Sequence, residues 1–120
     1  MTYENILVLC SCPDEAVARR IAHTLVDERL AACVNRLSAL RSTYRWQGRI
    51  EDEPEVLLLI KAGSARFEAL ERRIRTLHPH EIPEIIALPI VAGSQAYLDW
   101  LAHETTPESA TPADSSTVPY

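Results

Sequence analysis

The alternation of hydrophobic and polar positions divides the chain into short strands and amphipathic helices. A nearly continuous apolar run at 5–10 predicts a strand that is buried on both faces. Apolar residues then recur with helical spacing at 13–30 and again at 67–77, so both segments are predicted to be amphipathic helices. The second helix is predicted to follow a cap at 62–64 and to end at His78-Pro79. A second apolar run at 84–92 predicts another strand, and 93–103 predicts a short final helix.

Between the first two helices, residues 33–61 predict one β-hairpin that is too long for a small domain. Its two arms are rich in strand-forming residues and meet at a Gln47-Gly48 turn. At roughly 3.3 Å per residue each arm would span about 40 Å, whereas a compact domain of this length has a radius of gyration near ~13 Å. The far half therefore overhangs the core and carries Tyr44 and Trp46. Such an edge favours aggregation unless it is covered, so we expect an oligomer in which the hairpin contacts a neighbouring subunit.

The order of these elements is β-α-β-β-α-β followed by a helix, which predicts an α+β fold of the ferredoxin-like, split βαβ type. Because both long helices would cover one face of the sheet, the other face again requires other subunits. Pro89 places the last strand at an edge or a bulge, and Pro54 in the acidic run 51–55 predicts a bulge in the hairpin. We expect one domain at 1–104 and a disordered, Ser/Thr/Pro-rich tail at 105–120.

Composition narrows the classes of function. With 120 residues, 47% apolar content and a net charge of −5, the chain is typical of a soluble single domain without a nucleic-acid or membrane partner. No secretory signal and no apolar run of about 18 residues is visible, so we expect a cytoplasmic location. The three cysteines do not predict a disulfide framework. The sequence also lacks a phosphate-binding loop and hydrolase motifs, so an enzyme is the least expected class.

Two clusters of residues carry candidate chemistry, and the first is the pair Cys10 and Cys12 at the end of the first strand. Residues i and i+2 of a strand share a face, so two thiols could converge on one soft metal ion. In the alternative interpretation, Cys10 packs as a small apolar residue and Cys12 only precedes the helix. Cys33 begins a strand that we expect to be central, and is predicted to be a core residue.

The second cluster is His78-Pro79-His80-Glu81, which follows the second amphipathic helix. Imidazole and carboxylate groups are ligands for zinc, copper or nickel. Alternatively, this is a proline-stiffened loop whose polar groups form hydrogen bonds with backbone or water. The residues alone leave both interpretations open.

Eight short segments, taken in their order and spacing, are similar to one known family. They are 8–10, 13–16, 30–33, 44–48, 55–61, 78–79, 83–85 and 97–100. Through them the chain resembles the CutA family of divalent-cation tolerance proteins along nearly all of 5–102. The resemblance implies a ferredoxin-like subunit in a homotrimer whose long hairpin wraps a neighbour.

The resemblance also implies a metal site for copper, or for zinc or another divalent cation. Family ligands are a first-strand cysteine and histidines before a His-Pro turn, which correspond to Cys10 and His78. This sequence departs from the family pattern at three positions. Leu77 stands where some members have a second histidine, His80 stands where tyrosine is common, and Cys12 replaces a small residue that is often not a thiol. The expected ligands are therefore Cys10 and His78, with His80 and Cys12 as possible additions.

These observations predict a cytoplasmic, trimeric, non-enzymatic divalent-cation tolerance protein that binds copper or a similar ion. An alternative is a trimeric regulatory module, similar to the PII signalling proteins, that binds a small ligand in clefts between subunits. Residues 78–84, Tyr44 and Lys61 would line such a cleft. A third interpretation is a purely structural trimer whose thiols pack in the core.

Overall fold

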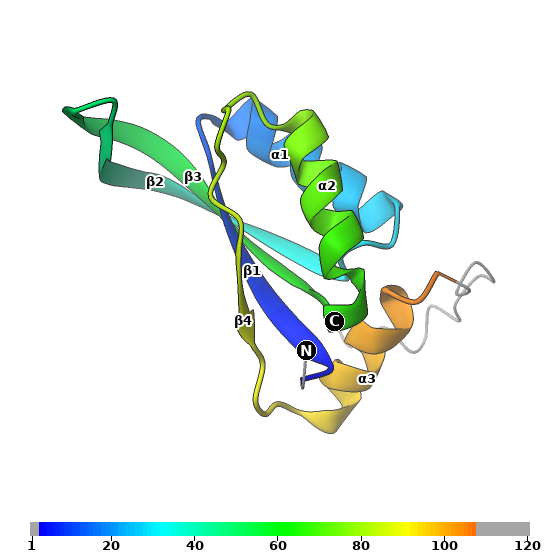
Figure 1. Cartoon of the computed structure of the whole chain (residues 1–120). Coiled ribbons are helices and arrows are strands. Elements are labelled where there is room, and N and C mark those ends of the chain that lie inside the picture. The colour runs from blue at the N-terminus through cyan, green and yellow to red at the C-terminus, as the bar shows by residue number, and fades with distance from the viewer. Residues whose placement is uncertain (1–2, 108–120) are drawn as a thin grey trace.

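The computed structural model describes residues 3–107, and this part of the chain forms an α+β fold with one antiparallel sheet and helices packed on one face of it (Figure 1). The elements are β1 (Asn5–Cys12), α1 (Glu15–Asp27), β2 (Cys33–Trp46), β3 (Arg49–Gly63), a 3₁₀ turn (Ser64–Arg66), α2 (Phe67–Leu77), β4 (Ile86–Pro89) and α3 (Gln95–Glu104). The four strands lie in the order β2-β3-β1-β4, and every neighbouring pair is antiparallel. The predicted order of strands and helices is confirmed.

The long hairpin is confirmed as well. Strands β2 and β3 pair out to Trp46 and Arg49, and the two-residue turn between them has positive φ at Gln47 (50°) and Gly48 (80°). Positive φ at both central residues is the signature of the tight turn that matches the twist of hairpin strands. The hairpin tip projects well beyond the helices in Figure 1, and the Cα trace extends 49 × 29 × 24 Å. Within the described part of the chain, the outer half of the hairpin therefore lacks a core of its own.

The bulge in this hairpin lies in β2 and not at Pro54, where we expected it. Pairing shifts register between Leu37 and Leu40, whereas Pro54 lies opposite Arg41 in regular register. Proline is tolerated at this point because, within the described sheet, β3 has no neighbour on its other side beyond Val56, the last residue that pairs with β1. The extra residue instead bends β2.

Replacing Ala39 by glycine should stabilise the protein. Ala39 sits in the bulge with φ of +62°, a left-handed conformation that costs a residue with a Cβ about 1–2 kcal/mol. After subtracting the entropy that glycine loses on folding, we expect a gain of about 0.5–1 kcal/mol in the free energy of unfolding. Urea unfolding of the wild type and the variant measures this gain in the free energy of unfolding. Ser42→Gly, in regular β2, is the control and should destabilise; a loss for both variants would contradict the strained bulge.

Helix α1 is shorter than the predicted 13–30. It begins after Asp14, whose carboxylate accepts a hydrogen bond from the backbone N–H of Val17 at 2.9 Å. It ends at Asp27 because Arg29 has φ of +57°, which a right-handed helix excludes.

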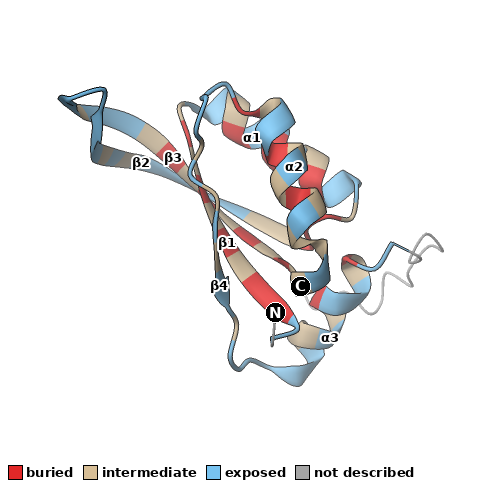
Figure 2. Cartoon of the chain, in the orientation of Figure 1, coloured by how far each residue is buried: buried red, intermediate tan, exposed pale blue. Residues whose placement is uncertain are grey.

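The core lies between the helices and one face of the sheet (Figure 2). Alternate residues of the two central strands are buried there: Ile6, Val8, Cys10 and Cys12 of β1, and Val56, Leu58, Ile60 and Ala62 of β3. The intervening β1 residues are only half-buried, so the prediction that this strand is buried on both faces is wrong for one face. An antiparallel strand covered on a single side alternates in this way.

The uncovered side of the sheet, here called the open sheet face, is also apolar. Strand pairing places these residues on it: Leu7, Leu9, Leu37, Leu57, Leu59, Ile86 and Leu88. Cys33 lies on the same face and is half-buried, and β2 is an edge strand of the described sheet. The expectation of a core cysteine on a central strand is therefore wrong for this part of the chain. A contiguous apolar surface of this kind is typical of an interaction site.

Strand β4 spans Ile86–Pro89 and is shorter than the predicted 84–92. In the described sheet it pairs with β1 alone, so Pro89 lies in an edge strand, one of the two positions predicted for it. Helix α3 begins after Ser94, whose hydroxyl accepts a hydrogen bond from the backbone N–H of Tyr97 at 3.3 Å.

The packed region continues one residue past the predicted boundary at 104, and most of the predicted tail, 108–120, lies outside the described residues. Thr105 is buried, and its Oγ1 accepts a hydrogen bond from the Gly63 N–H (3.2 Å) and donates one to the Leu101 carbonyl (3.0 Å). This hydroxyl joins the end of β3 to the end of α3.

Thr105→Ala should therefore lower the free energy of unfolding by about 1–2 kcal/mol, because the Gly63 N–H loses its acceptor. Thr106→Ala is the matched control. Thr106 is exposed and its hydroxyl bonds only to the Ala102 carbonyl of its own helix, so a change below about 0.5 kcal/mol is expected. Equal effects on the urea midpoint would show that Thr105 makes no special contribution.

Candidate metal centre

Cys10 and Cys12 end strand β1 on the side that faces the helices, and both are fully buried. They share this side because side chains of a strand alternate with a period of two. Cys12 belongs to the strand and pairs with Val56 of β3, so it does not merely precede the helix. Cys10 pairs with Leu58, and the two thiols are held by the regular part of the sheet.

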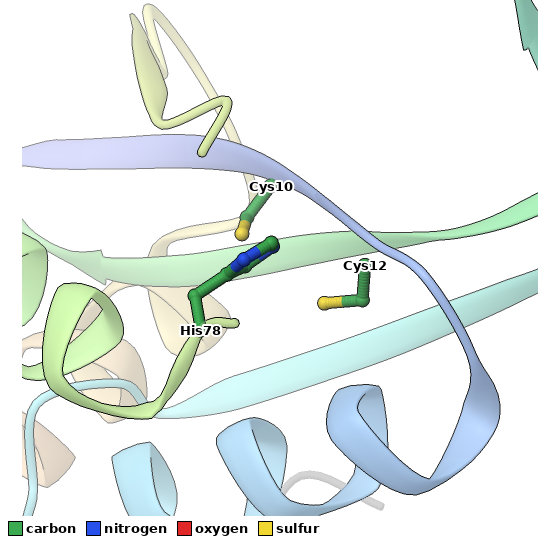
Figure 3. A group of neighbouring side chains, drawn as sticks. All are labelled: Cys10, Cys12 and His78. Carbon is green, nitrogen blue, oxygen red and sulfur yellow. The ribbon is translucent and has the colours of Figure 1, made fainter. Parts of the chain in front are cut away.

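His78 approaches the two cysteines from the end of α2 (Figure 3). Its N–H completes the last turn by bonding to the Ile74 carbonyl (2.8 Å), and its backbone then becomes extended before Pro79. The ring is buried, and one of its nitrogens and the two sulfurs all lie within 4.8 Å of one another. Within residues 3–107 this is a group of three donors placed closely enough to share an ion.

The two nitrogens of the His78 ring also contact backbone groups. Nε2 lies 2.8 Å from the carbonyl oxygen of Ser11, and Nδ1 accepts a hydrogen bond from the backbone N–H of His80 at 3.1 Å. Since a carbonyl oxygen can only accept, Nε2 carries the proton. The ring is thus fixed in one orientation between β1 and the loop after α2.

His80, the other candidate histidine, does not join the donor group. It is exposed, and its ring centroid lies 4.9 Å from that of His78. Its contribution to the site is the backbone amide that bonds to His78 Nδ1. Glu81 is exposed as well.

The two thiols shift each other's pKa in opposite directions. A hydrogen bond from Cys10 lowers the pKa of Cys12 to about 6, burial opposes this, and His78 adds to the lowering. The same hydrogen bond to Cys12, together with burial, raises the pKa of Cys10 far above its ordinary value. The hydrogen bond thus favours a Cys12 thiolate beside a protonated Cys10, and the thiolate is the form of cysteine that binds metal ions.

Burial and the neighbouring polar groups shift the pKa of His78 in opposite directions. Burial disfavours the charged ring, but the Cys12 sulfur and the Ser11 carbonyl favour it, and together they raise the pKa of His78. Glu55 and Glu84 add negative potential near the thiols, and the Ser11 hydroxyl donates to Glu84 at 3.2 Å. These groups favour a positive charge at the site.

The donor set fits a soft metal ion. Thiolate and imidazole ligands select copper and zinc over magnesium and calcium, which prefer oxygen. Around a tetrahedral ion with bonds near 2.3 Å, two sulfurs are about 3.8 Å apart. The sulfurs of Cys10 and Cys12 lie within 4.8 Å of each other, so they need to approach by about an ångström at most. Sequence reasoning missed the Ser11 carbonyl and the His80 amide, because a backbone group has no signature in the residue type.

Residues 6–104 match the model of a protein family described as CutA1 divalent ion tolerance protein. The chain is 52% identical over 99 residues to the divalent-cation tolerance protein CutA of Thermus thermophilus, covering 82% of this chain and 96% of that one. The protein CutA of Mus musculus is 46% identical over 96 residues, which cover 80% of this chain and 54% of the mouse protein. A solved structure of the Thermus thermophilus protein superimposes with a TM-score of 0.83 at 50% identity, over 85% of this chain and 99% of that one. The chain therefore belongs to the CutA family of divalent-ion tolerance proteins.

Proposed function

We propose that this protein is a non-enzymatic metal-binding protein that holds copper, or zinc or another soft cation, at Cys10, Cys12 and His78. One observation carries the proposal: two thiols and an imidazole, from β1 and from the loop after α2, converge within 4.8 Å in the core. The lowered pKa of Cys12 favours a thiolate, which supplies the negative charge that a cation needs. The family to which the chain belongs is described by tolerance to divalent ions, which supports the same class of ligand.

We further propose that the subunit is ferredoxin-like and assembles as a homotrimer. The strand order β2-β3-β1-β4 with two helices between the strands supports the fold. The apolar open sheet face and the overhanging hairpin support the assembly, since both leave large apolar side chains exposed. Three copies that cover one another's open sheet faces would bury both features.

A cytoplasmic location is part of the proposal. Cys10 and Cys12 are unpaired thiols, which a reducing compartment preserves. No helix among the described residues is long and apolar enough to span a bilayer.

The first test is a Cu(I) titration of the reduced full chain against a chromophoric chelator. The wild type should bind one ion per chain, and Cys10→Ser/Cys12→Ser should weaken binding by at least a hundredfold, about 2.7 kcal/mol. Cys33→Ser is the matched control, because its thiol lies on the open sheet face, and it should leave the affinity unchanged.

Two outcomes would contradict the metal-binding proposal: a folded wild type that binds no ion, or equal effects of the double variant and Cys33→Ser. Micromolar binding of a small anionic metabolite by the metal-free protein would instead favour a regulatory module similar to the PII proteins. In that case Tyr44, Lys61 and the loop at 78–84 would be the residues to replace.

A further inference from the structure

A groove in the helical layer gathers positive charge on a protein whose net charge is −5. It lies between the end of α1 and one side of α2, which pack together over the sheet (Figure 1). Its volume is about 410 Å³. We call it the arginine groove, and its walls and floor include three arginines, one glutamate and two apolar residues: Arg66, Arg72, Arg73, Glu28, Leu30 and Ala69.

The charge of Arg73 is balanced within the groove. Its Nε lies 3.0 Å from one carboxylate oxygen of Glu28, and its Nη2 lies 3.0 Å from the other. Its Nη1 donates a hydrogen bond to the hydroxyl of Thr76 at 3.1 Å. The guanidinium of Arg73 is thus held in one orientation between the end of α1 and the last turn of α2.

The charges of Arg66 and Arg72 have no such balance. The Nε of Arg66 donates to the carbonyl of Arg29 at 3.4 Å, which orients the guanidinium without neutralising it. Within the part of the chain that the structure describes, neither arginine forms an ion pair with a carboxylate. Two positive charges on one side of α2 therefore face the groove unmatched.

This charge and the arginine donors favour a phosphate group as the ligand. A phosphate monoester carries about −1.5 to −2 charges at neutral pH, which matches the two unbalanced guanidinium groups. The planar fork of N–H donors on arginine fits the oxygens of a phosphate, often with two parallel hydrogen bonds.

The size and the floor of the groove favour a ligand larger than inorganic phosphate. Leu30 is buried and Ala69 is half-buried, and together they offer an apolar surface next to the arginines. Small-molecule sites have volumes of about 300–1,000 Å³, and the arginine groove falls within this range. An organic group attached to the phosphate could therefore pack on the floor.

We propose that the arginine groove binds a phosphate monoester of a small metabolite, with the phosphate between Arg66 and Arg72 and the organic part on the apolar floor. None of the residues that line the groove is a donor of the candidate metal centre, so this inference is independent of the proposed metal binding. The groove belongs to the helical layer, and a trimer formed through the open sheet face would leave it accessible.

Isothermal titration calorimetry of the full chain with phenyl phosphate tests the site. We expect the wild type to bind this probe with a Kd of about 1 mM or tighter. Arg66→Gln and Arg72→Gln should each weaken binding at least tenfold, because each removes a fork of donors and a charge. Arg19→Gln is the matched control, since Arg19 is an exposed arginine of α1 outside the groove, and it should keep the affinity within twofold.

Glu28→Gln tests the charge balance in the opposite direction. The amide oxygen can still accept a hydrogen bond from Arg73, but the negative charge is gone and a third guanidinium is left for the phosphate. We expect phenyl phosphate to bind at least threefold more tightly. An exposed ion pair contributes little to stability, so the variant should fold like the wild type.

Three results would overturn the proposal. The first is a wild type that is folded by circular dichroism and binds no phenyl phosphate at about 10 mM, tenfold above the expected Kd. The second is a loss in Arg19→Gln as large as in Arg72→Gln, which would mean unspecific attraction to the helical layer. The third is inorganic phosphate binding as tightly as phenyl phosphate, because the apolar floor would then not contact the ligand.

Discussion

Replacing Leu37 by glutamate is expected to reduce the mass of the protein in solution from that of the proposed trimer to the 13.5 kDa of one chain. Leu37 lies on the open sheet face of β2, opposite Leu57, and its side chain is 49% exposed in the subunit. The subunit itself should therefore tolerate the change. In the proposed trimer the carboxylate would be buried without a partner, which costs several kcal/mol in each of three copies. Sedimentation velocity measures the mass.

Val26→Glu is the matched control for this experiment. Val26 is a comparable apolar residue, 44% exposed, but it lies on α1 in the helical layer. It should leave the mass unchanged. If Val26→Glu dissociates the assembly and Leu37→Glu does not, the subunits associate through their helices and the open sheet face needs another explanation.

The fold could be predicted to a large extent, because it depends on local pattern. Helical periodicity located the body and the end of α2, but a 3₁₀ turn follows the cap expected at 62–64 and the α-helix begins only at Phe67. Gly48 marked the hairpin turn because it readily adopts positive φ. The bulge at Ala39 was missed, although a signal exists. Leu37 and Leu40 both lie on the open sheet face but are three residues apart, one more than a regular strand allows.

Burial was harder to predict than element type. The run at 5–10 is apolar on both sides of the strand, and a sequence does not show whether a second layer comes from the same chain. Among residues 3–107, only the helices provide such a layer. If the proposed trimer covers the open sheet face, the apolar run reflects burial in the assembly.

The candidate metal centre, too, could be predicted from the sequence only in part. The spacing of Cys10 and Cys12 was enough to place both thiols on one side of a strand. The position of His78 beside them depends on how the end of α2 packs over the end of β1, 66 residues away from Cys12 in the chain. No periodicity contains that information, and only the family resemblance pointed to it. Neither the periodicity nor the family resemblance predicted that His80 would contribute its backbone amide and not its ring.

Truncating Leu58 to alanine should have the largest effect on stability. Leu58 is fully buried against the helices and is the cross-strand partner of Cys10. Removing its side-chain carbons leaves a cavity in a packed core, for which Leu→Ala substitutions cost about 3–5 kcal/mol. Because the cavity lies beside Cys10, the thiol gains room to move, and we expect the Cu(I) affinity to fall together with the free energy of unfolding. Urea unfolding in the Leu37→Glu background measures folding without the proposed assembly.

Leu59→Ala in the same background is the control, because it removes the same atoms from the next residue of β3. Leu59 is half-buried on the open sheet face and pairs with Leu9, so its truncation removes less buried surface and opens no enclosed cavity. We expect it to cost less than half as much as Leu58→Ala and to leave Cu(I) binding intact. Equal losses of stability would mean that the open sheet face is packed as tightly as the core within one subunit. A Leu58→Ala protein that loses stability but binds Cu(I) as tightly as the wild type would show that strand β1 alone fixes the geometry of the two thiols.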